Sequence, residues 1–223
     1  MKAVILAAGK GTRMGELTNT HPKPLLKIRG KTLLEYKMDI LPDTCNEIII
    51  IIGHLGEKIK EYFGQEYNGK KVTYIHADPM GTGFALWQAK EYLTEQFIVM
   101  CGDDLYTRKD VTECLKYDFS ALVSIAQDIQ SGGKVILENN IIKDIEEGTH
   151  KKGNVIATGL YVLNPEIFKF ELKKIDGRDE YGLPQTLMQI KEKGIHAVFA
   201  TAWHQVTSPA DLEVAEDKLN FFK

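Results

Sequence analysis

The feature that most constrains the fold is a regular alternation of strand and helix patterns over the first hundred residues. Four segments have the apolar or alternating composition of strands, namely residues 3–8, 47–52, 71–77 and 97–101. Three segments between them have helical spacing or helix-capping signals, namely residues 32–41, 55–63 and 82–93. Strands that alternate with helices in this way predict a mostly parallel sheet with helices on both faces.

From residue 119 the chain changes to a strand-rich pattern. Strand-like segments lie at residues 119–126, 134–137, 155–163 and 197–200. The sequence indicates no helix between the first three of them, and it predicts later helices at 181–193 and after the capping sequence Ser208-Pro-Ala-Asp211. Without a repeat or linker, we expect one domain over residues 1–223, with a small antiparallel insert after the parallel sheet.

Composition excludes several classes of protein. The chain is 43% hydrophobic, which is enough for a full core, and its net charge of −3 leaves no broad basic surface for nucleic acid or a membrane. Three cysteines without paired spacing argue against a disulfide framework. The longest aliphatic run, residues 48–52, is far shorter than the roughly 20 residues that span a bilayer. With no signal peptide at Met1, the expected location is the cytoplasm.

A glycine-rich loop follows the first strand, in the sequence Leu6-Ala-Ala-Gly-Lys-Gly-Thr-Arg-Met14. Glycines let backbone N–H groups approach a phosphate closely, and Arg13 adds a planar cation suited to phosphate oxygens. The glycines alone would also fit a simple tight turn. A nicotinamide-dinucleotide loop is disfavoured, because the second strand ends at Ile52-Gly-His54 without an acidic residue for the ribose.

Lys23 follows in the sequence His21-Pro-Lys-Pro24. The two prolines hold Lys23 on a stiff, extended backbone, so it can neutralise charge during phosphoryl transfer. An isolated Pro-Lys-Pro would more simply place a solvated lysine on the surface. Its position close behind a phosphate-type loop favours the catalytic interpretation.

Asp103 comes directly after the buried strand 97–101. Ligands of open α/β sheets bind at the carboxyl ends of the strands, and Mg²⁺ prefers one or two carboxylates together with phosphate oxygens. Asp103 therefore suits a magnesium ligand, although a helix cap or turn residue would look similar. Asp104 is expected to point elsewhere, because successive strand residues face opposite ways.

Together these segments resemble the signature of the sugar-1-phosphate nucleotidylyltransferases. The resemblance rests on the loop at residues 6–14, on Pro22-Lys-Pro-Leu-Leu26, on Pro79-Met-Gly-Thr82 and on Val99-Met-Cys-Gly-Asp103. It implies a three-layer α/β/α, Rossmann-like nucleotide-diphospho-sugar transferase fold, with a nucleotide-binding half over residues 1–110 and an acceptor-binding half over residues 111–223. The implied reaction is an in-line attack of a sugar 1-phosphate on the α-phosphorus of a nucleoside triphosphate, which is Mg²⁺-dependent and releases pyrophosphate.

The resemblance also implies roles for individual residues. The implied catalytic residues are Arg13, Lys23 and Asp103, of which Asp103 holds the metal. The implied nucleotide-binding residues are Leu6, Ala7, Ala8, Gly9, Lys10, Gly11, Thr12, Arg13, His76, Pro79, Gly81, Thr82 and Gly102. The implied acceptor-binding residues are Gly133, Glu147, Thr158, Gly159 and Glu180.

This chain departs from the family's pattern mainly on the acceptor side. The lysine that usually follows the acceptor glutamate is missing after Glu147, and the family's late aspartate is replaced by Gln205, a neutral candidate for a second metal ligand. Three lysines are candidate replacements for the missing one: Lys134, Lys151 and Lys152. His76 stands where many members read a pyrimidine with glutamine, and Pro184-Gln185 replaces the usual threonine-aspartate.

Three interpretations remain open. The first is an active enzyme that uses UTP or dTTP ahead of CTP or GTP, with a sugar 1-phosphate as acceptor or, as a cytidylyltransferase, with a non-sugar phosphate monoester. The second is a catalytically idle relative that binds a nucleotide sugar and regulates a partner, as Gln205 would allow. The third, an NAD-linked reductase, rests on the glycine pattern alone. We expect small-molecule partners only and a monomer or small homo-oligomer.

Overall fold

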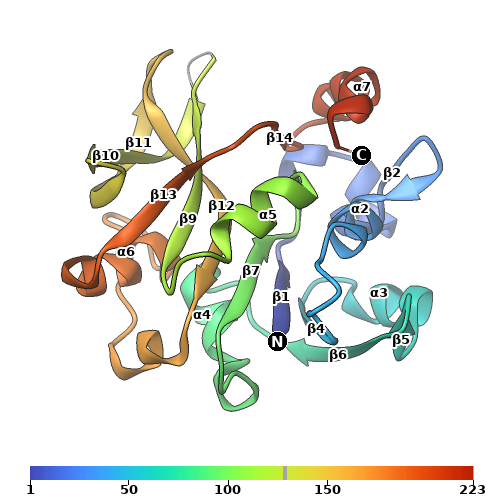
Figure 1. The fold of residues 1–223 in the computed structure, drawn as a ribbon. Coiled ribbons are helices and arrows are strands. Elements are labelled where there is room, and N and C mark those ends of the chain that lie inside the picture. The colour runs from blue at the N-terminus through green and yellow to red at the C-terminus, as the bar shows by residue number, and fades with distance from the viewer. Residues whose placement is uncertain (128–129, 223) are drawn as a thin grey trace.

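The computed structural model describes residues 1–127 and 130–222 and has a ten-stranded mixed sheet at its centre (Figure 1). In spatial order its strands are β10 (Gln130–Glu138), β11 (Ile141–His150), β13 (Ile195–Phe199), β9 (Ser120–Ile125), β12 (Val155–Leu163), β7 (Phe97–Cys101), β1 (Lys2–Ala7), β4 (Glu47–Ile52), β6 (Lys70–His76) and β5 (Glu66–Tyr67). Two smaller sheets pair β2 (Lys27–Ile28) with β3 (Lys31–Thr32) and β8 (Asp104–Leu105) with β14 (His204–Gln205).

Helices cover both faces of the sheet, which confirms the three-layer α/β/α prediction. The α-helices are α1 (Leu17–Thr20), α2 (Leu33–Asp39), α3 (Gly56–Phe63), α4 (Thr82–Trp87), α5 (Arg108–Cys114), α6 (Leu183–Leu187) and α7 (Pro209–Lys218). The faces of β1 alternate: Ile5 packs in one apolar cluster with α2, α3 and α5, and Val4 packs in the other with α4 and α6. A third, smaller cluster lies under α7. No helix in the described part of the chain is long and apolar enough to cross a membrane.

The register of the parallel strands positions the end of each strand relative to its neighbours. β1 lies between β4 and β7, with Ala7 opposite Ile52 and Leu6 opposite Cys101. The loop after β1 and the turn after β7 therefore emerge at the same edge of the sheet, as expected for parallel strands whose ligands bind at their carboxyl ends. This register brings segments about ninety residues apart in sequence to one place.

The second half attaches to the sheet through antiparallel pairing. β12 runs antiparallel to β7 and to β9, and β10 forms a long hairpin with β11, which stands at one end of the molecule in Figure 1. β10 also touches β12, where Lys134 pairs with Ile156. The strands of this half therefore curl back on themselves instead of extending the flat edge of the sheet.

Local signals explain most element boundaries. The capping box expected at Thr32 is present, since Thr32 Oγ1 accepts from Glu35 N at 3.1 Å and Thr32 N donates to Glu35 Oε2 at 2.7 Å. The box at Ser208 opens α7 in the same way. The helices expected at 82–93 and 181–193 are shorter, because each ends in a 3₁₀ turn, at Lys90–Tyr92 and Met188–Lys193. Other 3₁₀ turns lie at Thr12–Met14, Lys23–Leu25, Pro165–Lys169 and Leu219–Phe222.

The short elements α1, β2, β3, β5, β8 and β14 were not predicted, and neither were the longer β11 and α5. β11 is mostly polar and exposed, with inward positions such as Ile142 and Ile145 that are too sparse to read as a strand. The strand expected at 134–137 is the core of the longer β10, with which β11 pairs. α5 is only 7 residues long. Its N-terminus is capped by Thr107, whose Oγ1 accepts a hydrogen bond from Asp110 N at 3.1 Å.

Candidate active site

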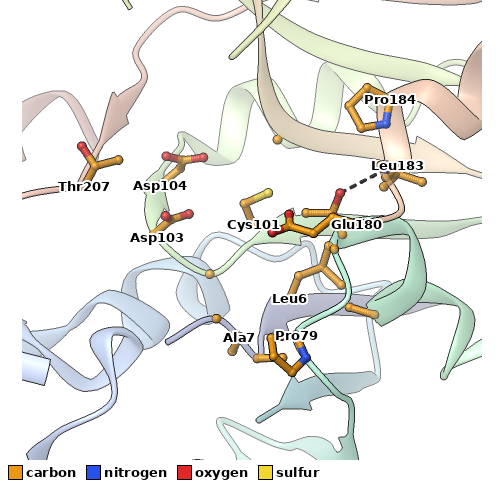
Figure 2. Close-up of a pocket in the computed structure, with 18 of the residues that line it drawn as sticks. Leu6, Ala7, Pro79, Cys101, Asp103, Asp104, Glu180, Leu183, Pro184 and Thr207 are labelled. Atoms are coloured by element: carbon orange, nitrogen blue, oxygen red, sulfur yellow. Dashed lines mark hydrogen bonds between the residues drawn. The ribbon is translucent and has the colours of Figure 1, made fainter. Parts of the chain in front are cut away.

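A cavity of about 700 Å³ opens at the carboxyl ends of β1 and β7. The first half contributes the loop after β1, Lys23 and Pro24, the segment after β6 and the turn after β7. The second half contributes residues of β10, β11 and β12, the segment 175–185 and the residues around β14. Figure 2 shows Asp103, Asp104 and Thr207 on one side of this cavity and Pro79, Glu180 and Leu183 on the other.

The loop after β1 lies along the cavity as predicted, and all of residues 6–13 line it. Gly11 has φ +67°, a left-handed conformation that favours glycine, and a Cβ at this position would lie 3.0 Å from Lys23 Cβ. Thr18 Oγ1 donates to Gly11 O at 3.1 Å and fixes the turn from the other side. The loop is thus packed directly on Lys23, with Lys10 and Arg13 exposed at its surface.

Lys23 and Asp103, which both line the cavity, form an ion pair. Lys23 Nζ donates to Asp103 Oδ2 at 2.8 Å, with side chains that are 9% and 32% exposed. Lys23 begins a 3₁₀ turn after the extended Pro22, which directs the residue inward and leaves it buried. The structure therefore brings together the lysine and the aspartate that the sequence singled out.

Asp104 corrects one expectation, since its side chain lines the same cavity as Asp103. The residue is 2% exposed, its Oδ2 accepts from the Tyr106 hydroxyl at 3.1 Å, and its Oδ1 has no hydrogen-bond partner among the described residues. Burial and the neighbouring charge of Asp103 raise the pKa of Asp104 well above its usual range, against the opposing effect of Lys37. A turn, not a continuing strand, follows Cys101, so strict alternation does not apply.

Lys37 is a charged residue near this site that the sequence did not indicate. It lies in α2, is fully buried, and donates to Leu33 O at 3.1 Å. Burial lowers the pKa of Lys37 to about 8, although the nearby Asp104 and Asp103 favour its charged form. Lys37 could have been found from its position on the buried side of α2, because a buried lysine normally has a nearby opposite charge.

The oxygen donors near Asp103 suit a magnesium ion whose ligand shell is completed by phosphate oxygens. Gln205 lines the cavity and lies opposite Asp104 in the β8–β14 pair. No group of three acidic, histidine or cysteine side chains suited to a metal occurs within the described ranges. Two carboxylates beside a glycine-rich loop are a donor set that Mg²⁺ can use when substrate phosphates supply the remaining ligands.

The five acceptor candidates all line the cavity: Gly133, Glu147, Thr158, Gly159 and Glu180. Gly133 and Glu147 face each other across the β10–β11 hairpin. Thr158 is buried, and its hydroxyl donates to Leu122 O at 2.9 Å, so this side chain supports the strand. Glu180 is exposed at the opposite side of the cavity from Asp103 (Figure 2).

Other candidates lie outside the cavity. His76 is exposed at the end of β6 and does not line it, because the chain turns away before the cavity-lining segment that starts at Asp78. Lys134 Nζ pairs with Glu146 Oε2 at 3.0 Å, and neither Lys151 nor Lys152 lines the cavity.

Arg178 is the cation that the second half places at the cavity. It lies in a hairpin-like segment, residues 173–182, in which Gly182 N donates to Lys173 O at 3.0 Å. Tyr181 docks this segment on the first half, since Tyr181 N donates to Met80 O at 2.7 Å. Gly81 has φ +99° and a Cβ there would lie 2.4 Å from Tyr181 O, so only glycine permits this contact. Arg178 was not predicted from the sequence because it lies in an irregular charged segment.

Comparison with known proteins agrees with this geometry. The model of a family described as nucleotidyl transferase matches residues 2–220. The bifunctional protein GlmU of Methanocaldococcus jannaschii is 34% identical over 230 residues, which cover 99% of this chain and 55% of that protein. The chain thus spans about half the length of this relative. The UTP–glucose-1-phosphate uridylyltransferase AglF of Haloferax volcanii is 29% identical, over 98% of this chain and 96% of its own length.

The solved structures show the same fold. A UDP-glucose pyrophosphorylase in complex with UDP-glucose superimposes with a TM-score of 0.81 at 21% identity, covering 100% of this chain and 99% of that one. From the family match along nearly its whole length, this chain belongs to the nucleotidyl transferase family.

Proposed function

We propose that this enzyme condenses a nucleoside triphosphate with a sugar 1-phosphate to give a nucleotide sugar and pyrophosphate. The observation that carries the proposal is the Lys23–Asp103 pair, at 2.8 Å, beside the loop after β1 and in the same cavity as Glu147 and Glu180. One cavity of about 700 Å³ has room for both substrates.

The nucleotide would bind along the first half. Backbone N–H groups of residues 8–12 and the guanidinium of Arg13 would hold the triphosphate. The base would lie against Pro79, Gly81 and Thr82, and UTP or dTTP is the proposed nucleotide. Because His76 lies outside the cavity, it takes no part in this proposed choice of base.

The acceptor would bind between β11 and the segment 173–182. Glu147 and Glu180 would accept hydrogen bonds from sugar hydroxyls, and Arg178 would attract the acceptor phosphate. Arg178 takes the place we expected of Lys134, Lys151 or Lys152. A phosphate monoester other than a sugar phosphate also carries the group that Arg178 would recognise, and is the alternative acceptor.

The reaction needs alignment and charge neutralisation, not an enzyme-bound intermediate. An oxygen of the acceptor phosphate attacks the α-phosphorus, the bond from that phosphorus to the bridging oxygen breaks, and pyrophosphate leaves with the electron pair. Arg13 and Lys23 would stabilise the charge on the equatorial and leaving oxygens. Mg²⁺, held by Asp103 with Asp104 or Gln205 nearby, would neutralise phosphate charge when bound.

Pyrophosphate release tests the proposal. The enzyme is incubated with Mg²⁺ and each of UTP, dTTP, CTP, GTP and ATP, against a panel of sugar 1-phosphates and alcohol phosphates. Release from one pairing that Asp103→Ala abolishes is the expected result and identifies both substrates. Silence of the whole panel, together with demonstrable binding of a nucleotide sugar, would instead support the regulatory interpretation.

A further inference from the structure

The ion pair between Lys23 and Asp103 has a consequence for metal binding. Lys23 Nζ lies 2.8 Å from Asp103 Oδ2, and the side chains are 9% and 32% exposed. The ammonium group is therefore in contact with the carboxylate to which the proposed function assigns the metal ion.

A magnesium ion and an ammonium group compete for one carboxylate. Mg²⁺ requires short contacts of about 2.0–2.1 Å to carboxylate oxygens, and the lysine ammonium is itself a compact point charge. Solvent screens two neighbouring cations poorly in a partly buried site, so they repel each other strongly. Asp103 can hold a metal well only after Lys23 has moved to another acceptor.

Asp104 is a poor acceptor for Lys23, although its Oδ1 has no hydrogen-bond partner among the described residues. It is 2% exposed, its Oδ2 accepts from Tyr106, and it already has the buried Lys37 as a nearby cation. A bound triphosphate does provide an acceptor, because the loop that would hold it packs directly on Lys23, with 3.0 Å between Lys23 Cβ and a Cβ placed on Gly11. Its oxygens could both accept from Lys23 and complete the ligand shell of the metal.

We propose that Lys23 occupies the metal's place on Asp103 in the free protein and transfers to the triphosphate when nucleotide and metal bind together. The inference rests on the proposed function. It makes metal and triphosphate binding mutually dependent, with each strengthening the other by the same factor, as linkage requires. Metal alone binds weakly because Lys23 opposes it.

Binding of Mn²⁺, followed by the EPR signal of the free ion, tests this exchange. In the wild type, a non-hydrolysable analogue of the active triphosphate should tighten Mn²⁺ binding about 10-fold or more. Lys23→Met should bind Mn²⁺ alone about 10-fold more tightly than the wild type, while its turnover falls and the coupling weakens to the part that the triphosphate oxygens contribute as metal ligands. If Lys23 had a purely structural role, its removal would not be expected to improve metal binding.

Two variants serve as controls. Lys10→Met removes another lysine of the same cavity, one with no ion pair to Asp103 among the described residues, and should change Mn²⁺ affinity by less than about threefold. Lys23→Arg keeps a cation and should keep the weak binding of metal alone. Lys23→Gln repeats the test if Lys23→Met does not give the circular dichroism of the wild type.

The exchange is wrong if folded Lys23→Met or Lys23→Gln binds Mn²⁺ alone no more tightly than the wild type. It is also wrong if Lys10→Met gives the same gain, because general charge removal would then explain it. Failure of the proposed function would look different: the wild type would release no pyrophosphate from any substrate pair. The comparison of metal binding in the absence of nucleotide would still decide the exchange.

Discussion

The two halves of the chain build their shares of the cavity in different ways. In the first half, most lining residues lie at the ends of the parallel strands β1, β6 and β7 or shortly after them, where the register of the sheet positions them. Lys23 and Pro24 are added by the 3₁₀ turn that packs on the loop after β1. In the second half, the lining residues lie within the antiparallel strands β10, β11 and β12, in the segment 175–185, which is held through Tyr181, and around β14. The proposed nucleotide side is thus fixed mainly by the parallel register, and the proposed acceptor side by antiparallel strands together with the docking of the segment 173–182.

This difference suits an enzyme family in which the transfer reaction stays the same while the acceptor molecule varies. Phosphoryl transfer requires fixed cations and a fixed metal ligand, whereas acceptors vary in shape and in their hydroxyl groups. Binding groups on exposed segments can change without disturbing the sheet. We therefore expect substitutions in the first half to cost most in stability or turnover, and those in the second half to change mainly the affinity for acceptor.

The largest expected effect concerns the buried charges of Lys37 and Asp104, beside the turn after β7. Lys37→Met should destabilise the protein by about 3–5 kcal/mol, because the buried Asp104 then lacks its nearby cation. The double variant Lys37→Met/Asp104→Asn removes both charges and should recover most of that loss. Urea denaturation of both variants measures the difference. A single variant as stable as the wild type would show that Lys37 does not compensate Asp104.

The next effect tests catalysis on the nucleotide side. Arg13→Ala should lower turnover by about 100-fold or more, which is typical of losing a preorganised charge at the transition state. Pyrophosphate release at saturating substrates measures it. Arg29→Ala removes an exposed arginine that does not line the cavity and is the matched control. Near-normal turnover of Arg13→Ala would remove Arg13 from the proposed mechanism.

How well the sequence predicted each part follows from the same comparison. The patterns at residues 47–52, 97–101 and 155–163 have the bounds of β4, β7 and β12, because strands buried on both faces are continuously apolar. β11 was missed because its exposed positions are polar and its buried positions few. The short α5 was missed because its capping residue, Thr107, is followed by only two buried apolar positions, Val111 and Cys114.

The site shows the same limits. Lys23 and Asp103 could both be predicted because each stands in a recognisable segment; the β1–β7 register brings the loop after β1 beside Asp103, and Lys23 packs on that loop. Arg178 could not be predicted, since its place depends on how Tyr181 docks on Met80 across about a hundred residues of chain. The sequence also does not show that β6 ends with an exposed His76 before the cavity-lining segment that starts at Asp78.

A smaller effect tests the acceptor side directly. Arg178→Gln should raise the KM for the phosphate acceptor about 10-fold while leaving the KM for the nucleotide near its wild-type value. Initial rates at varied acceptor concentration measure it. Lys134→Gln is the control, because Lys134 is engaged with Glu146 outside the cavity. If only Lys134→Gln raised the KM for the acceptor, the cation that binds the acceptor phosphate would be Lys134 of β10 and not Arg178.

The smallest effect concerns the capping box that orders the approach to α7. Asp211 Oδ2 accepts from the backbone N–H and hydroxyl groups of Thr207 and Ser208, at 2.7–2.9 Å, and Thr207 lines the cavity. Burial raises the pKa of Asp211, but these hydrogen bonds lower it by more, so the pKa of this carboxyl lies below its usual value. Asp211→Asn should cost about 1 kcal/mol of stability at neutral pH.

The pH dependence of that loss identifies its cause. A carboxyl group whose pKa is lower in the folded than in the unfolded chain stabilises the fold above its unfolded pKa of about 3.9, and the contribution disappears as the pH falls through the folded value. The stability difference between wild type and Asp211→Asn should therefore be constant near neutrality and shrink below about pH 4. Urea denaturation from pH 7 to pH 3 measures it. A difference that stays constant down to pH 3 would mean that the amide weakens the cap by its shape and not by its lost charge.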